Sequence, residues 1–354
     1  MRVACAVSPP PCSASRSRLV GRVKSITTYP LKGARGESLR SSRVEKGGSV
    51  ENDRAFALLR HEHIEKRWSS LSDPETNATD ILRAGTAKDP GHHSNKHLFH
   101  QLITDPSLAK VSARRVGERG VQIVLPGSSP EKVLAACADV RVAKEREPVE
   151  RFFSTFLETA SGVAKPPLLT FASGHSFANV GGQPGEHVLH INAEPSAVEA
   201  FERLGRKKEG AESLASFTAR FRANLVVEDA GDGTLRAFDE LQWCGRSLLI
   251  GDEVQVRVNE PTIRCPSTRA RVPEARDAAS DDDDRVKTLL RQPVDVEGVV
   301  PDLDARVAFP DLTASIFGRE PVRLAEKGSY FGVYATVVRA GVVREGDEVR
   351  LEET

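Results

Sequence analysis

This sequence of 354 residues contains few aromatic residues and few cysteines. It also has no excess of charge of either sign. Lys and Arg together number 50, as do Asp and Glu, so the formal net charge is zero and a nucleic-acid-binding protein is not expected. No apolar run approaches the roughly 18 residues that cross a bilayer, so we expect no transmembrane segment. A hydrophobic content of 39% with 28% charged residues is typical of a globular chain of about two domains.

The cysteines are few, odd in number, widely spaced and without a CxxC pair. They are Cys5, Cys12, Cys137, Cys244 and Cys265. A disulfide framework and a zinc site are therefore not expected, and a reducing compartment fits better. A P-loop, a Rossmann glycine fingerprint and an HExxH zinc helix are also missing.

Two short segments approach a catalytic or metal-binding motif without completing one. Residues 174–178 resemble a nucleophile elbow but lack its final glycine, and the last histidines are His187 and His190, so serine hydrolysis is not expected. Residues 92–100 contain four histidines, which suggest either a metal site or a solvated loop. Because no Cys, Asp or Glu lies among them as a further ligand, we expect a loop.

The first carboxylate of the chain is Glu37, so the leading residues carry no acidic side chain. A bias toward Arg, Ser and Ala without acids is typical of an organellar transit peptide. A polar leader without a targeting function is the equal alternative. We therefore expect a disordered leader or a transit peptide at residues 1–18, and the compartment stays open between the cytoplasm and an organelle (mitochondrion or plastid).

The apolar periodicity predicts a β-dominated α+β fold. Strand patterns at roughly ten-residue spacing, in residues 19–33, 37–46 and 53–59, are typical of a barrel or a sandwich. Helices are expected where apolar residues recur at helical spacing, over 149–157, 196–204 and 212–221. Strands are expected at 187–192 and 224–228, and a terminal hairpin-like pair at 330–338 and 346–351.

The stretch from Val258 to Arg269 is where we place the chemistry. Residues 248–258 alternate apolar and polar side chains around a turn, which predicts two short strands, and Pro261 ends their ladder. Arg264 and Cys265 are therefore expected in a loop at the mouth of a sheet, a common location for reacting groups.

Three interpretations of Cys265 remain open. It is a small buried thiol, a nucleophile activated by the adjacent arginine, or a thiolate that ligates a soft metal. A metal ligand would need a charged frame, and the cations near predicted strand ends, Lys32, Arg54, Arg222 and Arg264, could supply one. Guanidinium groups suit phosphate oxygens, although each such arginine could equally be a surface ion-pair partner.

Taken together, these segments resemble the MOSC-domain proteins, which carry the domain found at the C-termini of molybdenum cofactor sulfurases, preceded by a MOSC N-terminal β-barrel domain. The N-terminal resemblance rests on residues 29–36 (YPLKGARG) and 52–56 (NDRAF). The MOSC resemblance rests on 221–226 (FRANLV), 250–252 (IGD), Arg264-Cys265, 331–335 (FGVYA) and 346–349 (GDEV).

The resemblance implies an N-terminal β-barrel domain at residues 19–140, followed by a MOSC-type β-barrel with peripheral helices at 141–354. It implies a molybdenum cofactor (molybdopterin) whose metal is ligated by Cys265. The cofactor would be gripped by Lys32, Arg54, Arg222, Asn224 and Arg264.

The best-understood relatives, similar to the mitochondrial amidoxime-reducing component, reduce N-hydroxylated small-molecule substrates with electrons from cytochrome b5. A molybdenum-dependent oxidoreductase acting on N-hydroxylated or N-oxide substrates is therefore the expected function, with a cofactor or sulfur carrier without turnover as the alternative.

The sequence departs from those relatives in several places. Thr262 stands where some members have a second cysteine, and residues 269–273 replace a run that carries an acidic group. Residues 292–325 resemble an insertion, and the relatives' membrane anchor has no counterpart in the sequence. A pyridoxal-phosphate desulfurase domain is also missing, so the chain is not expected to mobilise sulfur from cysteine by itself.

Overall fold

The computed structural model describes residues 17–63, 98–126, 132–161, 165–172, 176–177, 189–203, 213–264 and 330–353, and the structural statements below concern these residues. The expected leader, most of the histidine-rich loop, residues 174–175, Cys265 and the expected insertion at 292–325 lie outside them. Within the described ranges, no helix has both the length and the apolar character needed to span a membrane.

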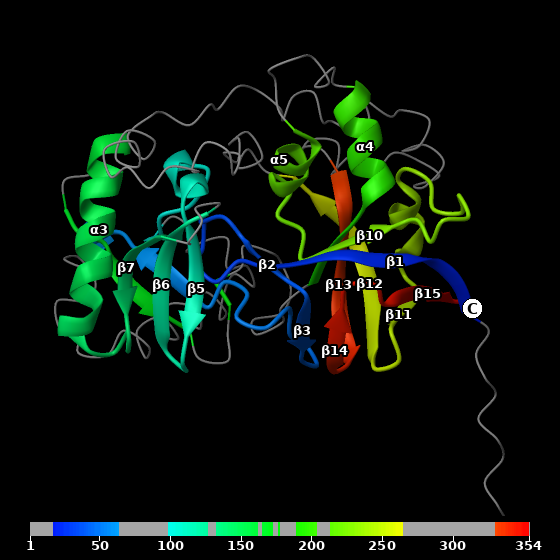
Figure 1. The fold of residues 1–354 in the computed structure, drawn as a ribbon, viewed down its shortest axis with the longest axis horizontal. Helices are drawn as coiled ribbons and strands as arrows, with labels where there is room; N and C mark the ends of the chain where they lie inside the picture. The colour runs from blue at the N-terminus through cyan, green and yellow to red at the C-terminus, as the bar shows by residue number, and fades with distance from the viewer. Residues whose placement is uncertain are drawn as a thin grey trace, which may run out of the picture.

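A closed β-barrel forms the larger sheet, seen at the right of Figure 1. Its strands are β1 (Ser17–Thr28), β9 (Leu189–Ala193), β10 (Leu225–Glu228), β11 (Ser247–Ile250), β12 (Val254–Ile263), β13 (Tyr330–Arg339) and β15 (Glu348–Glu352). They follow the order β10-β9-β13-β12-β11-β15-β1, and β1 closes the ring by pairing with β10, while β2 (Glu37–Leu39) also pairs with β1. Strands β9 and β10 are parallel, and the other neighbours in the ring are antiparallel.

The inside of this barrel is filled by aliphatic and aromatic side chains. On β1, Val23 and Ile26 are almost fully buried, and on β12 Val254, Val256 and Val258 alternate with more exposed residues. This alternation is what one buried face of a sheet requires. The barrel interior is therefore one continuous hydrophobic core.

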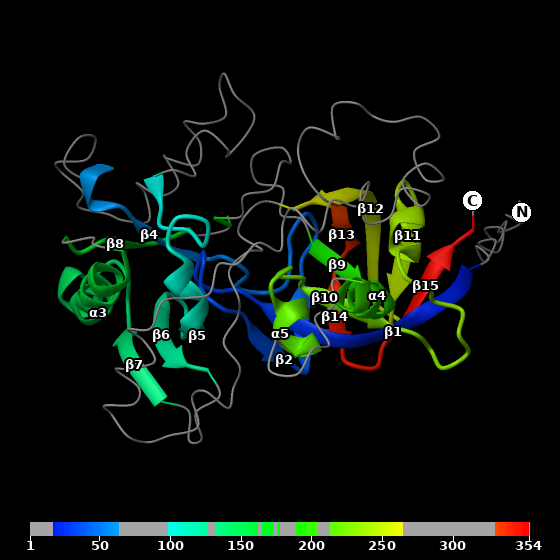
Figure 2. The same ribbon diagram turned by 90° about the horizontal axis from the view of Figure 1, so that it is seen from above.

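A second group of elements, here called the α3 lobe, lies beside the barrel (Figures 1 and 2). It contains β4 (Phe56–Leu59), β5 (Ser112–Val116), β6 (Gly120–Leu125), β7 (Lys132–Cys137), β8 (Leu168–Phe171), helix α3 (Ala143–Ser161) and the 3₁₀ helix η3 (Pro106–Lys110). Strand β4 pairs with β8, and β5, β6 and β7 form a three-stranded sheet. Phe153 and Leu157 of α3 are fully buried in its core, as their helical spacing predicts.

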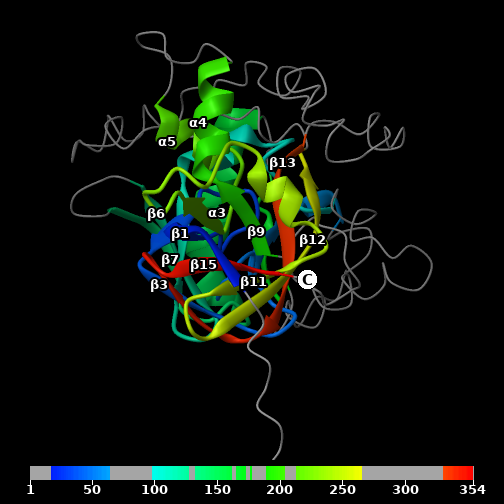
Figure 3. The same ribbon diagram turned by 90° about the vertical axis from the view of Figure 1, so that its right-hand side faces the viewer.

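Two helices cover one end of the barrel, α4 (Glu194–Arg203) and α5 (Leu214–Ala219), as Figure 3 shows. Helix α4 continues directly from β9 with Pro195 in its first turn, where a missing N–H costs nothing. Helix α5 begins at the Ser213 cap, whose hydroxyl accepts a hydrogen bond from the Ser216 N–H at 3.2 Å. A 3₁₀ helix, η4 (Asp239–Trp243), precedes β11.

The predicted β-dominated class is confirmed, as are the three helices and the β11–β12 hairpin. The prediction that the last two strands pair as a terminal hairpin is wrong. Strand β13 pairs with β12 and β9, whereas β15 pairs with β11 and β1, because a further strand, β14 (Gly341–Arg344), lies between them in sequence and pairs with β3 (Ser41–Val44). Local spacing indicates strands but not their distant partners.

Strand pairing crosses the predicted domain boundary at residue 140 in both directions. Strand β1 closes a barrel whose other members come after residue 188, and β8 pairs with β4. The division of the chain into domains at 19–140 and 141–354 stays a prediction.

Gly332 lies where β13 approaches β9 most closely. A Cβ at this position would come within 1.9 Å of Asn192 Oδ1 and 2.8 Å of His190 Nε2. The φ angle of Gly332 is +77°. We expect Gly332→Ala to lower the free energy of unfolding by about 3 kcal/mol, from the combined overpacking and backbone strain.

Gly346→Ala is the matched control for this substitution. Its φ is +87°, but nothing lies within 4 Å of the added Cβ. We expect it to cost about 1 kcal/mol, the backbone strain alone. Equal losses in urea unfolding of the two variants would show that the close approach of Asn192 does not matter.

Glu240 is a fully buried carboxyl group in η4. Its Oε2 accepts a hydrogen bond from Ser196 Oγ at 2.7 Å, and burial raises the pKa of Glu240 from 4.5 to about 7. The folded state binds this proton more tightly than the unfolded state does, so the protonated Glu240 carboxyl group stabilises the fold. This stabilisation is complete below the unfolded pKa and is lost as the pH rises to 7.

We therefore expect the free energy of unfolding to fall by about 3 kcal/mol between pH 4.5 and 7 through this group. Glu240→Gln should remove that part of the pH dependence in urea unfolding curves. Parallel curves for the two proteins would contradict this assignment.

Candidate functional site

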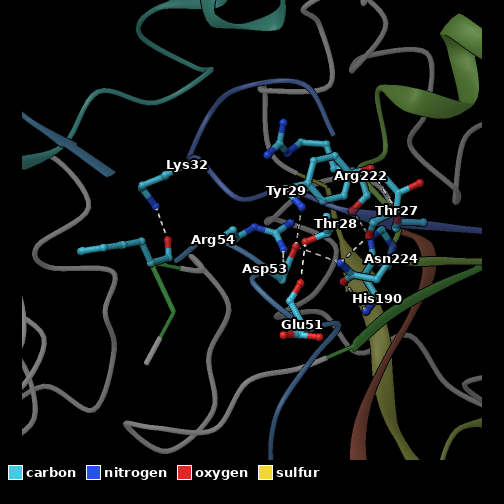
Figure 4. A network of polar contacts seen from close by, with 12 residues as sticks. Thr27, Thr28, Tyr29, Lys32, Glu51, Asp53, Arg54, His190, Arg222 and Asn224 are labelled. Atoms are coloured by element: carbon cyan, nitrogen blue, oxygen red, sulfur yellow. Dashed lines mark hydrogen bonds and ion pairs between the residues drawn. The ribbon is translucent and has the colours of Figure 1, made fainter. Parts of the chain in front are cut away.

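Asp53 is the centre of a polar network between the barrel and the loop that precedes β4 (Figure 4). Its side chain is 2% exposed. Its Oδ1 accepts hydrogen bonds from the Tyr29 N–H and from Asn224 Nδ2, each at 3.0 Å, and its Oδ2 accepts one from Arg54. One buried carboxylate thus joins the end of β1, the loop and the start of β10.

The ring of Tyr29 lies against two guanidinium groups. Arg54 lies 5.2 Å and Arg222 4.2 Å from the ring centroid, distances at which a cation and an aromatic face attract. The phenol donates to the Ala223 carbonyl at 3.1 Å, and burial raises the pKa of Tyr29 to about 12. The ring therefore stays neutral and acts as a rigid support for both cations.

Arg54 and Arg222 share an unusual backbone conformation. Their φ angles are +53° and +52°, in the left-handed region that side chains other than glycine rarely adopt. Such strain costs of order 1–3 kcal/mol and clusters at functional sites. The structure therefore marks these two arginines independently of any sequence motif.

Arg222 is a partly buried cation without a direct carboxylate partner among the described residues. Its guanidinium donates to the Ala34 carbonyl, and burial, followed by repulsion from Arg54, lowers its pKa to about 10. It still carries its proton at neutral pH. A partly buried charge in this state favours the binding of an anion.

Asn224 is fully buried, and its side chain is occupied by protein groups. Besides Asp53, its Nδ2 donates to the Thr27 carbonyl at 3.2 Å, and its Oδ1 accepts from the His190 N–H at 3.1 Å. These contacts tie β10 to β1 and β9. They give Asn224 a positioning role, and its predicted contact with a cofactor stays a prediction.

His190 connects Arg222 to Arg264, which follows β12 directly. Its Nε2 accepts from Arg264 at 3.0 Å, so the ring proton is on Nδ1, which donates to the Arg222 carbonyl at 3.2 Å. Burial, followed by the charge of Arg264, lowers the pKa of His190 well below its ordinary value. Arg264 also donates to the Phe221 carbonyl, so a neutral histidine and a backbone oxygen hold it in place.

Lys32 lies apart from this cluster, as Figure 4 shows. Its side chain is almost fully buried, and Nζ donates to the Phe177 carbonyl at 2.7 Å. The structure thus brings together Arg54, Arg222, Asn224 and Arg264 through Tyr29, Asp53 and His190. Lys32 stands apart from them in Figure 4, and Cys265, which follows Arg264 in the sequence, lies outside the described residues.

Sequence reasoning missed Tyr29, Asp53 and His190 as site residues. Tyr29 and Asp53 lie in the two N-terminal segments that carry the resemblance. Asp53 is a charged residue between apolar strands, and this position is a signal that could have identified it. His190 gave no signal beyond its place in a strand. Cys137 and Cys244 are free thiols, and burial raises the pKa of each to about 11, so neither is suited to act as a nucleophile.

Two more polar side chains are fully buried near Arg264. Neither the carboxamide atoms of Asn192 nor Thr262 Oγ1 has a hydrogen-bond partner within the described part of the chain. Asn192 faces Gly332 between β9 and β13, and Thr262 lies two residues before Arg264. Buried polar groups without partners cost about 1–3 kcal/mol each, so they favour a polar ligand.

Comparison with protein families supplies the deciding observation. A model of the MOSC domain matches residues 178–350, and a model of the MOSC N-terminal beta barrel domain matches residues 20–74. The chain belongs to the MOSC-domain proteins. Such domains are associated with molybdenum-cofactor-binding and sulfurase-like proteins.

Among solved structures, this MOSC-domain protein is similar to the YUAD protein from Bacillus subtilis at 10% identity. The match covers 96% of this chain and 99% of that one, with a TM-score of 0.34. YiiM from Geobacillus stearothermophilus matches at 17% identity over 47% of this chain and 54% of that one, with a TM-score of 0.23. No curated protein matches the sequence.

The residues of this MOSC-domain protein fit an anionic cofactor. Arg222 is a partly buried cation that lacks a direct carboxylate, and Asn192 and Thr262 present buried polar atoms without partners in the described residues. Among those residues no group of three or more His, Cys, Asp or Glu could hold a metal ion. Cys265, the predicted metal ligand, lies outside the described residues.

Proposed function

We propose that this MOSC-domain protein binds a molybdenum cofactor and acts as an oxidoreductase on N-hydroxylated or N-oxide small molecules. The observation that carries the proposal is the pair of strained, partly buried arginines on one aromatic ring, Arg54 and Arg222, in a chain of this family. Arginine forks recognise phosphate oxygens, and the cofactor carries a phosphate.

Each residue of the network has a role in this proposal. Arg54 and Arg222 bind the phosphate, and Tyr29 and Asp53 fix their orientation. His190 orients Arg264, which precedes Cys265 in the sequence, and Cys265 would ligate the metal as a thiolate. When bound, the cofactor supplies a molybdenum centre able to exchange two electrons and an oxygen atom.

The reaction proposed for an N-hydroxylated substrate balances as a reduction. The N–O bond breaks, two electrons and two protons are taken up, and the oxygen leaves as water. The electrons come from a donor of the cytochrome b5 type. In this account the described residues bind and orient, and Lys32 contributes a further buried cation beside the Phe177 carbonyl.

The test is the molybdenum and pterin content of protein from a host that makes the cofactor, followed by reduction of a benzamidoxime with a chemical electron donor. Molybdenum and pterin in equal amounts, with turnover, would support the proposal. Cofactor without turnover would limit the function to binding or carriage. Folded protein free of metal and pterin, with a persulfide on Cys265 by intact mass, would replace it with the sulfur carrier.

A further inference from the structure

A cavity of about 530 Å³ opens beside the arginine network, between β1, β2, α5 and the start of β10. Arg222 forms part of its wall, together with Arg35 and Arg220. Among the described residues that the sequence predicts to bind the cofactor, Arg222 alone lines this cavity. The volume falls within the range of about 300–1,000 Å³ that small-molecule sites occupy.

The charge of this cavity is positive. Lys24 also lines it, but it forms ion pairs with Glu194 and with Glu228, the latter at 3.6 Å, so its charge and that of the lining carboxylate Glu194 compensate each other. Arg222 has no direct carboxylate partner among the described residues and remains protonated at neutral pH. Arg35 is also partly buried, and this burial lowers the pKa of its guanidinium.

Part of the cavity lining is apolar. Leu102 and Ala109 reach it from the α3 lobe, and Leu214 from α5. Inorganic phosphate would pair with Arg222 but leave the apolar lining without a contact. A ligand with a phosphate at one end and a flat, partly apolar group at the other would contact both parts of the lining.

We propose that the cavity binds a nucleoside monophosphate group, with its phosphate at Arg222 and Arg35 and its base against Leu102, Ala109 and Leu214. The group has two possible sources: a free nucleotide, or a nucleotide joined to the phosphate of the cofactor. The second source rests on the proposed function, and the first does not.

The first arm of the test uses the full chain from a host unable to make the molybdenum cofactor. Calorimetry with AMP, GMP, CMP, UMP and inorganic phosphate measures each affinity. We expect at least one nucleotide to bind about tenfold tighter than phosphate, and Arg222→Gln to weaken nucleotide binding about 10- to 100-fold. Ala219→Trp, which narrows the cavity from α5, should weaken the nucleotide more than phosphate.

Arg344→Gln is the control, because Arg344 is an exposed arginine on β14 away from the cavity lining. Its affinities should equal those of the unchanged protein, and thermal melting verifies that each variant is folded. Arg222 also supports the proposed cofactor site, so Ala219→Trp is the variant that tests the cavity by itself.

The second arm uses protein from a cofactor-producing host, with acid release of nucleotide measured against pterin. Release of one nucleotide per pterin identifies the joined form, whereas nucleotide binding to cofactor-free protein identifies the free form. Molybdenum and pterin without either result would leave the proposed function standing and overturn this inference. Nucleotide binding by a protein that never acquires molybdenum would support this inference and overturn the proposed function. Equal affinity for phosphate and all nucleotides, with none released, would also overturn the inference.

Discussion

An Asp53→Ala protein is expected to lose about 3–5 kcal/mol of unfolding free energy, the cost of removing one partner of a buried ion pair. The substitution leaves the Tyr29 N–H, one hydrogen of Asn224 Nδ2 and the Arg54 guanidinium without their acceptor. It also removes the carboxylate that offsets the repulsion between Arg54 and Arg222, so anion binding should change along with stability.

Asp53→Asn is the informative companion. It keeps an oxygen to accept from Tyr29 and Asn224 but removes the charge next to Arg54, so we expect a smaller loss of about 2 kcal/mol. Asp252→Ala is the control, because Asp252 is exposed in the β11–β12 turn. Urea unfolding of the three proteins measures the effect. An unchanged midpoint for Asp53→Ala would refute the central role of this carboxylate.

A Cys265→Ala protein is expected to lose bound molybdenum, by at least the tenfold to hundredfold that changes around a metal ligand typically cost. Pterin retention should fall less, because Arg54 and Arg222 remain to bind the phosphate. The measurement is the ratio of molybdenum to pterin per chain in protein from a cofactor-producing host. This ratio separates loss of a metal ligand from loss of the whole cofactor.

Cys244→Ala provides the matched thiol control. Cys244 is partly buried just after η4, and burial raises the pKa of its thiol, so it should not ligate the metal. Its molybdenum content is expected to equal that of the unchanged protein. Full retention of molybdenum by Cys265→Ala would contradict the assignment of Cys265.

The strands and helices could be predicted from the sequence because each depends on a local pattern. Val254, Val256 and Val258 alternate into the core, and Phe153 and Leu157 share one helix face. Pairing partners depend on contacts between distant residues, such as Leu19 with Arg350, which spacing does not encode. This is why the two ends of the chain look like separate strand groups in the sequence and form one barrel in the structure.

The candidate site shows the same division. Charged residues at strand ends, such as Arg54 and Arg222, could be found from residue type and position. Their positive φ angles and their shared contact with Tyr29 could not, because both arise from the way β1 meets the loop before β4. His190 escaped prediction since its function comes from two partners, Arg264 and the Arg222 carbonyl, that are far from it in sequence.

The placement of β1 also determines when the molecule can be completed during synthesis. Strand β1 is synthesised long before its partner β15, because most of the sequence lies between them. Until then Val20, Val23 and Ile26 have no barrel interior to enter, and the open strand edge invites pairing with other chains. The barrel therefore cannot close before residues 348–352 emerge from the ribosome, and chaperone occupancy of the nascent chain should persist until then.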